Sequence, residues 1–292
     1  MFGTPGGAYE KRGEYLAGAG VSRRKFNHWV EAGWRKLEAR NPKLEWNWKH
    51  GAGSARSQHP PILWHLVLRL SAGYNSMMFI QELFSDPRFF LAVCITVIVS
   101  ICLHELAHGV IAIVHGDRTP IETGHMTLNP AAHITPVSII CLLVAGIAWG
   151  SMPVDPRRLR GRYGSALVAA AGPASNILLA ILAIAAVGLW QRLDPRATAE
   201  LPLQAQNFQY LLWVFGIVNV HLALFNLVPI PPLDGSRVLA SFSHRYAAAM
   251  QTLESSGAVI TMYLLLFCVA GALTAPLAPR IAAQLLQVIR GH

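Results

Sequence analysis

The chain has little charge. Only 13% of its 292 residues are Asp, Glu, Lys or Arg, against roughly 25% in soluble globular domains. By contrast, 53% are hydrophobic, and the mean hydropathy is +0.39. This balance excludes an ordinary soluble domain and predicts an integral membrane protein.

Cysteine is also scarce. The four cysteines all fall inside apolar stretches, and no two have the spacing of a metal site: Cys94, Cys102, Cys141 and Cys268. This pattern excludes a secreted disulfide framework, and we expect no disulfides. The first 25 residues lack the hydrophobic core of a signal peptide, so we expect no cleaved leader.

Basic residues are concentrated in two places. Residues 1–60 hold 11 Lys and Arg against 5 Asp and Glu, and four arginines lie in PRRLRGR at 156–162. Because cytoplasmic loops of membrane proteins are enriched in Lys and Arg, we expect both stretches on the cytoplasmic side. Residues 1–61 are therefore predicted to form a basic, Trp-rich cytoplasmic arm, and docking of a protein partner to this arm is one hypothesis for its role.

Apolar segments close to the ~20 residues that cross a bilayer core follow the arm. They lie at about 89–115, 134–152, 165–190, 208–230 and 256–276. A further segment at 62–84 contains His65, Arg69 and Glu82, which leave a surface helix and a weak spanning helix open. We predict an all-α polytopic membrane protein with five to six transmembrane segments around a three-helix core.

Domain boundaries follow from these segments. The predicted parts are the arm at 1–61, an amphipathic or weakly spanning segment at 62–88, the core at 89–245, and a C-terminal transmembrane segment with an amphipathic tail at 246–292. The tail at 278–290 has the periodicity of a helix with one polar face, and we expect it to lie on the membrane.

Residues 104–108 read HELAH in the middle of an apolar run. On a helix, His104 and His108 share a face and Glu105 lies about 100° round. This pattern gives two imidazole ligands for zinc and a general base for a bound water. The metal then needs a third protein ligand and keeps its fourth position for water. Two hydrogen-bonded histidines in a bundle are the plainer alternative, but ionisable groups inside a membrane are costly and usually functional.

The predicted third ligand is Asp234. It follows the apolar segment 208–230 in the sequence PPLDG and is the only carboxylate beside that segment's end. The prolines and the glycine around it break the helix and turn the carboxylate inward, as expected where irregular backbone lines a cavity. A simple turn at the membrane surface is the alternative.

With AGPASN at 171–176 added, the sequence resembles the site-2 proteases, which are intramembrane zinc metalloproteases. HELAH, AGPASN and NLVPIPPLDG (226–235) are similar to the family's three signature segments in order and spacing. TLNPAAHITP (127–136) is similar to the TLNPxxHIDP segment of a small bacterial subgroup. The resemblance covers about residues 90–245.

This resemblance implies one zinc ion held by His104, His108 and Asp234, with Glu105 as the base and proton shuttle. It also implies that Asn176 and Asn226 line the site. The chain departs from the family's pattern in three places: Ala107, Thr135 and the run WGSMPVD at 149–155. The last two bear on substrate handling and leave the metal ligands intact.

Three further side chains are candidates for oxyanion or substrate contacts. Asn176 or Asn226 could donate a hydrogen bond to the oxyanion of a reacting carbonyl, or could instead hold membrane helices together. His133 opens an apolar segment inside the TLNP-like run and is a candidate for contact with the substrate or for support of the site.

The positions of the motifs also predict topology. HELAH lies in the C-terminal half of its segment, and Asp234 lies just past the C-terminal end of its own, so these two helices should run in the same direction. If the arginine loop at 156–162 is cytoplasmic, 165–190 runs outward and 208–230 runs inward, which places Asp234 near the cytoplasmic face. The HELAH helix must then run inward as well, so 134–152 cannot be a single crossing and must enter the membrane and return to the same side. We therefore expect a re-entrant or short β element at 134–155, whose extended end offers a strand edge to an unwound substrate.

These observations predict an intramembrane zinc metalloprotease that hydrolyses a peptide bond in or next to a transmembrane substrate. Its expected surroundings are the lipid bilayer and a transmembrane protein or peptide substrate, without nucleic acid, in the bacterial cytoplasmic membrane rather than an organelle membrane. A metal transporter or sensor and an inactive protease-like subunit of a larger complex stay open as alternatives. Glu105 argues against the transporter or sensor, because binding an ion needs no base. The inactive subunit ranks last, because nothing is missing from the catalytic set.

Overall fold

The computed structural model describes residues 79–193, 202–254, 271, 274 and 276–290. Within these residues the regular secondary structure is helical, without a strand. The elements are η2 (Phe79–Gln81), α4 (Glu82–Ser85), α5 (Pro87–Val114), α6 (Thr119–Glu122), α7 (Pro130–His133), α8 (Pro136–Ala145), α9 (Gly164–Leu193), α10 (Leu203–Asn226), α11 (Asp234–Phe242), α12 (His244–Glu254) and α14 (Leu277–Arg290).

In the described ranges, three helices are long and apolar enough to cross a membrane: α5, α9 and α10. They match the predicted segments at 89–115, 165–190 and 208–230. Much of the apolar surface of α5 and α9 faces outward, as shown by Leu91, Ile95, Leu178 and Leu182. Such surface is unfavourable in water but suits contact with lipid tails, which are as apolar as leucine.

The predicted count of five to six transmembrane segments stays a prediction. The arm at 1–61 and most of the segments at 62–84 and 256–276 lie outside the described residues.

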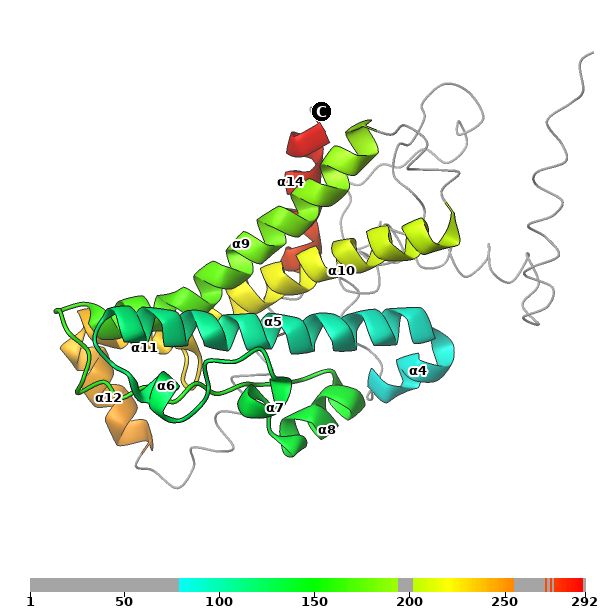
Figure 1. The fold of residues 1–292 in the computed structure, drawn as a ribbon. Helices are drawn as coiled ribbons and strands as arrows, with labels where there is room; N and C mark the ends of the chain where they lie inside the picture. The colour runs from blue at the N-terminus through cyan, green and yellow to red at the C-terminus, as the bar shows by residue number, and fades with distance from the viewer. Residues whose placement is uncertain (1–78, 194–201, 255–270, 272–273, 275, 291–292) are drawn as a thin grey trace, which may run out of the picture. The chain divides into compact units, whose positions relative to one another are not determined.

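Helices α5 and α10 run in the same direction (Figure 1). Near their starts, the Arg88 guanidinium donates to the Gln206 carbonyl at 3.0 Å and lies 4.1 Å from the centre of the Tyr210 ring. Further along, the Asn219 amide donates to Ser100 Oγ at 2.8 Å. The expected parallel arrangement of these two helices is thereby confirmed, and α9 packs against both in the opposite direction.

Between α5 and α9 the chain leaves and returns at the same end of α5. After α8 ends at the left-handed Gly146 (φ 71°), an extended stretch runs back beside it. The hydroxyl of Ser138 forms hydrogen bonds with both the N–H and the carbonyl of Trp149, each at 2.8 Å. The N–H of Arg160 then donates to the His115 carbonyl at 2.7 Å.

This path shows why 134–152 is not one continuous spanning helix. The ten residues of α8 are too few for the ~20 that a bilayer core requires, and the stretch after Gly146 reverses direction. No strand forms at 134–155 among the described residues. Residues 147–155, which we call the return limb, are nevertheless extended.

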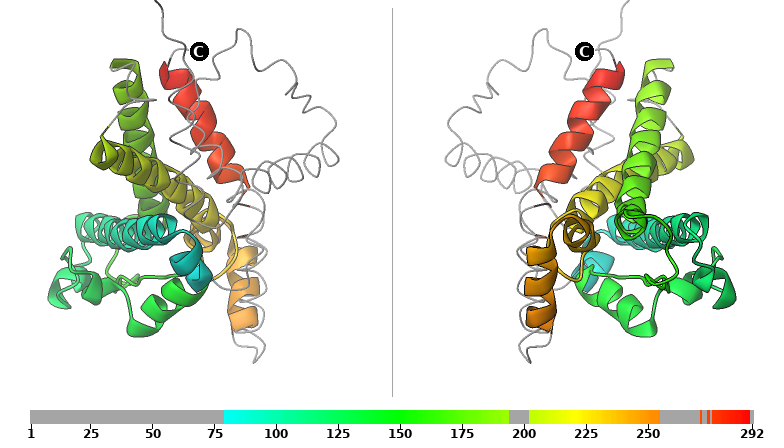
Figure 2. Two further views of the ribbon diagram at one scale, coloured as in Figure 1. Left: turned by 90° about the vertical axis from the view of Figure 1, so that its right-hand side faces the viewer. Right: turned by 90° about the vertical axis from the view of Figure 1, so that its left-hand side faces the viewer.

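The predicted tail helix is present as α14, and it packs against α9 and α10. Its inner face buries Ala278, Ala282 and Leu286. A methyl group on Gly188 of α9 would lie 2.7 Å from Ile289 Cγ2, so these two helices approach closely. Figure 2 shows α14 on the other side of α10 from α7 and α8. The three long helices are therefore the frame on which the site is built.

Candidate metal centre

Helix α5 supplies the two imidazoles of the site. His104 and His108 are one turn apart and buried, with 7% and 8% of their surface exposed. Their Nε2 atoms lie 3.0 Å from each other. The i, i+4 spacing of HELAH therefore does bring both ring nitrogens to one point, as a helix requires.

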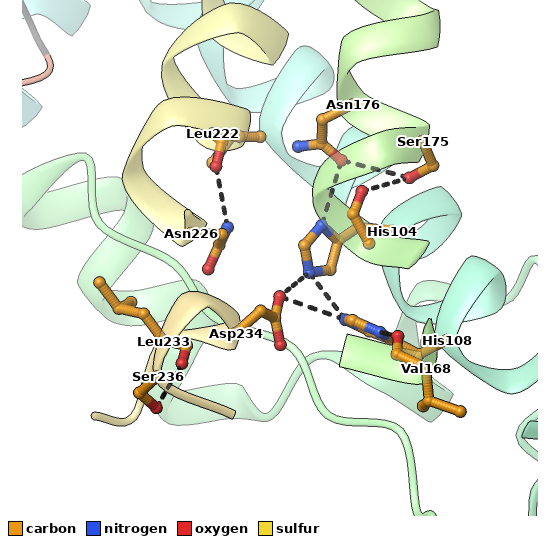
Figure 3. A network of polar contacts seen from close by, with 11 residues as sticks. His104, His108, Val168, Ser175, Asn176, Leu222, Asn226, Leu233, Asp234 and Ser236 are labelled. Carbon is orange, nitrogen blue, oxygen red and sulfur yellow. Dashed lines mark hydrogen bonds and ion pairs between the residues drawn. The ribbon is translucent and has the colours of Figure 1, made fainter. Parts of the chain in front are cut away.

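The turn after α10 supplies the carboxylate. Proline at 229, 231 and 232 prevents the helix from continuing, and the Tyr246 hydroxyl donates to the Pro229 carbonyl at 2.9 Å. Asp234 then opens α11, with its Oδ2 atom 3.0 Å from His104 Nε2 and 3.3 Å from His108 Nε2 (Figure 3). The ligand atoms of the three residues all lie within 4.8 Å of one another.

Helix α9 fixes the orientation of both imidazoles. His108 Nδ1 donates to the Val168 carbonyl at 2.6 Å, and His104 Nδ1 donates to Asn176 Oδ1 at 3.1 Å. A carbonyl oxygen only accepts, so each neutral ring carries its proton on Nδ1 and turns a bare Nε2 lone pair toward Asp234.

This arrangement fits a zinc ion. Two Nε2 lone pairs and a carboxylate oxygen, all acceptors, converge at about hydrogen-bond distance, which is repulsive unless a cation lies among them. Two imidazoles and one carboxylate, with hydrogen-bonded Nδ1 atoms behind them, are a recurrent set of protein ligands in catalytic zinc sites. Space is kept by Gly172, because a methyl group there would lie 2.5 Å from both Nε2 atoms.

Asp234 lies outside the membrane-spanning helices and is held as a carboxylate. Burial raises the pKa of its side chain, but hydrogen bonds and positive charge from His104 and His108, when these rings are protonated, lower it further, so that the pKa lies well below the ordinary value. A cation bound to neutral rings would act in the same direction. An ionised side chain is the form that binds a metal.

Glu105 lies beside the three residues and is available for chemistry. The residue is 8% exposed, and within the described part of the chain its side chain makes no hydrogen bond. The backbone of Gly150 packs against it, since a methyl group at that position would lie 2.7 Å from Glu105 Oε1. The extended stretch after α8 therefore runs past the predicted base.

The other candidates from the sequence differ in their surroundings. Asn176 is fully buried and contacts His104 directly. Asn226 donates to the Leu222 carbonyl at 3.0 Å and lies on the α10 side of Asp234 (Figure 3). His133 is outside the three-residue cluster; its Nε2 donates to the Thr127 carbonyl at 2.7 Å, and its carbonyl accepts from Ser151.

Comparison with known proteins decides the family. The profile of peptidase family M50 matches residues 92–270, more than half of the chain. The chain belongs to peptidase family M50. The resemblance to the site-2 proteases is thereby confirmed, and with it membership of a family of membrane zinc metalloproteases.

Curated relatives of this M50 peptidase point the same way. It is 37% identical over 173 residues to "Putative zinc metalloprotease YwhC" of Bacillus subtilis, covering 58% of this chain and 78% of the relative. It is 29% identical over 192 residues to "Putative zinc metalloprotease Rip2" of Mycolicibacterium smegmatis, covering 62% of this chain and 70% of the relative. An archaeal relative, "Putative zinc metalloprotease MJ0611" of Methanocaldococcus jannaschii, is 27% identical over 172 residues, covering 56% of this chain and 79% of the relative. No solved structure matches the chain significantly.

Sequence reasoning missed some of what supports this M50 site. The carbonyl that orients His108 belongs to Val168, an apolar residue whose side chain gives no sign of the contact. The approach of Gly150 to Glu105 brings together residues 45 positions apart on different elements. Neither contact has a local sequence signature, and only the backbone path reveals them.

Proposed function

We propose that this protein is an intramembrane zinc endopeptidase that hydrolyses a peptide bond in or next to a transmembrane segment. His104, His108 and Asp234 hold one zinc ion, and Glu105 is the general base. The observation that carries the proposal is the convergence of three acceptor atoms within 4.8 Å. Beside them lies the buried carboxylate of Glu105, which makes no hydrogen bond to any residue that the structure describes.

The chain's own residues have distinct roles in this reaction. Zinc, when bound, supplies a Lewis acid that polarises a peptide carbonyl and lowers the pKa of water. Glu105 takes the proton from the attacking water and passes it to the leaving amine. Asn176 orients His104, while Asn226 has a second amide N–H beyond its bond to Leu222 and is our candidate donor to the oxyanion.

The substrate enters from the side of the extended return limb. We propose that α8 and residues 147–155 form a re-entrant element in the cytoplasmic half of the bilayer. Irregular backbone at that depth is tolerated where it lines a cavity. Its backbone edge, where the N–H groups of Met152 and Val154 make no hydrogen bond among the described residues, would align an unwound substrate by β-augmentation. The adjoining arginines at 157–162 favour the cytoplasmic face of a bacterial cytoplasmic membrane.

A metal transporter, a sensor and an inactive subunit are the competing functions. None of them needs a carboxylate free of hydrogen bonds beside the ligands, whereas hydrolysis does. Within the described residues, Glu105 has that position, and on this ground we favour the protease.

The decisive experiment compares the zinc-loaded wild type with Glu105→Gln on a panel of transmembrane peptides. Glutamine keeps the size of the side chain but cannot take a proton, so we expect zinc to stay bound while cleavage falls by about 10²–10⁴-fold. The matched control is Glu122→Gln, which changes an exposed glutamate paired with Arg158 at 2.7 Å and should leave cleavage unaltered. Cleavage that is indifferent to Glu105→Gln would remove the protease proposal.

A further inference from the structure

A buried carboxylate that the proposed reaction does not use lies just beyond the end of α5. Asp117 is fully buried. Its Oδ1 atom accepts from the N–H and the hydroxyl of Thr119, at 2.9 and 2.5 Å, and its Oδ2 atom accepts from the N–H of Asp155 at 2.7 Å. A buried charge is tolerated only when its acceptor sites are satisfied in this way.

The two oxygens of Asp117 accept hydrogen bonds from different parts of the chain. The bonds to Thr119 are local and stabilise the turn that leads into α6. The bond from Asp155 joins residues 38 positions apart, and therefore ties the loop after α5 to the far end of the return limb. A four-residue surface helix does not by itself require a fully buried carboxylate, so the second bond is the informative one.

The return limb follows α5 from the predicted base to this anchor. Gly150 packs against Glu105, and Met152 packs against Gly109, with its Sδ atom 3.2 Å from the position of a methyl group there. Four helical residues, from Glu105 to Gly109, rise about 6 Å, and two extended residues, from Gly150 to Met152, advance about 6.6 Å. The return limb and α5 therefore advance by similar distances from one contact to the next, and Asp155 reaches Asp117 just beyond the end of the helix.

Hydrogen bonds hold this limb near each end and leave its middle free. The Ser151 N–H donates to the His133 carbonyl at 3.0 Å, and the Asp155 N–H donates to Asp117. In the part of the chain that the structure describes, the N–H groups of Met152 and Val154 make no hydrogen bond. This half-buried stretch of backbone is thus held at two anchors, and its distance from Glu105 depends on both.

We infer that Asp117 is a positioning residue for the substrate: by holding Asp155, it keeps residues 150–155 alongside Glu105. The inference rests on the proposed function, because the limb matters for catalysis only if a substrate lies along it. Asp117 itself touches neither the metal ligands nor Glu105. Its loss should therefore weaken substrate binding without removing zinc or slowing the chemical step.

The test is Asp117→Asn in the zinc-loaded full-length chain, with Thr119→Val as the matched control. Asparagine has the size of aspartate but one acceptor oxygen in place of two, so it cannot satisfy both sets of donors. We expect KM for a cleaved transmembrane peptide to rise about tenfold, with kcat and zinc content unchanged. Thr119→Val removes one local donor and keeps the Asp155 bond, and should leave KM unchanged.

Hydrogen exchange of the same proteins gives a readout that does not need activity. Asp117→Asn should speed exchange of the amides of 150–155, but not those of 104–108. If that variant fails to fold, Asp155→Pro removes the donor N–H instead, and Asp155→Ala retains it as the control.

Two results would overturn the inference. One is unchanged exchange in 150–155 when the Asp155 bond is removed, and the other is an equal rise of KM in Asp117→Asn and Thr119→Val. A wild type that cleaves no peptide would count against the proposed function alone, since the exchange measurement still decides whether Asp117 holds the limb.

Discussion

Replacing Gly172 with alanine should greatly weaken metal binding while leaving the helix intact. The added methyl carbon would lie 2.5 Å from Cε1 and Nε2 of His104 and from Nε2 of His108. Non-bonded carbon atoms prefer separations of about 3.5–4.0 Å, so both rings would have to retreat by about 1 Å. Distances from ligands to a metal vary by only about 0.2 Å.

The expected loss of zinc affinity is at least about 100-fold, because removing a group that merely orients a ligand already costs about 10–100-fold. Competition with a chelator of known affinity measures it. Alanine favours a helix over glycine by about 1 kcal/mol, so weakening of α9 itself would not explain the loss. The control is Gly188→Ala, on the same helix but against Ile289, which should bind zinc normally. Wild-type affinity in Gly172→Ala would refute the placement of the metal between the two rings.

Three further predictions follow from contacts around the site. Asn176→Ala should weaken zinc binding by about 10–100-fold in the same chelator competition, because it frees the ring of His104, whereas Ser175→Ala should not. Burial raises the pKa of Asp117, but hydrogen bonds from Thr119 and the N–H of Asp155 lower it further, so the pKa lies below the ordinary value. The stabilisation of the fold by this ionised group is therefore present above about pH 4 and is lost as the pH falls through the lowered pKa. The difference in Tm between wild type and Asp117→Asn should shrink below pH 4, and a constant difference would contradict this. Cysteines introduced at positions 157 and 203 should react with impermeant reagents from opposite sides of the membrane, and labelling from one side would contradict the arrangement of α9.

The helices of the core could be predicted closely because apolar length determines them. The segment expected at 165–190 is α9 at 164–193, and the one expected at 208–230 ends at Asn226, ahead of the prolines. The convergence of His104, His108 and Asp234 was predictable for a related reason, since HELAH has helical spacing and Asp234 stands alone at a helix end. In both cases the signal lies in a short stretch of sequence.

The return of the chain after α8 was harder to predict, because 134–152 has the composition of a spanning segment. Only the charge of the arginine loop and the requirement that α5 and α10 be parallel argued against one crossing. The Asp117 anchor was not predicted at all. A polar residue in a loop resembles a solvated one, and its burial depends on a partner 38 positions away.

The most direct test of the metal centre is the zinc K-edge X-ray absorption spectrum of the purified wild type and of Asp234→Ala, with zinc content measured on the same samples. We predict one zinc per wild-type chain, with two imidazole nitrogens and carboxylate and water oxygens at about 2.0–2.2 Å, and little zinc in Asp234→Ala. A wild type without zinc, or an unchanged spectrum and zinc content in Asp234→Ala, would contradict the assignment of His104, His108 and Asp234 as the ligands.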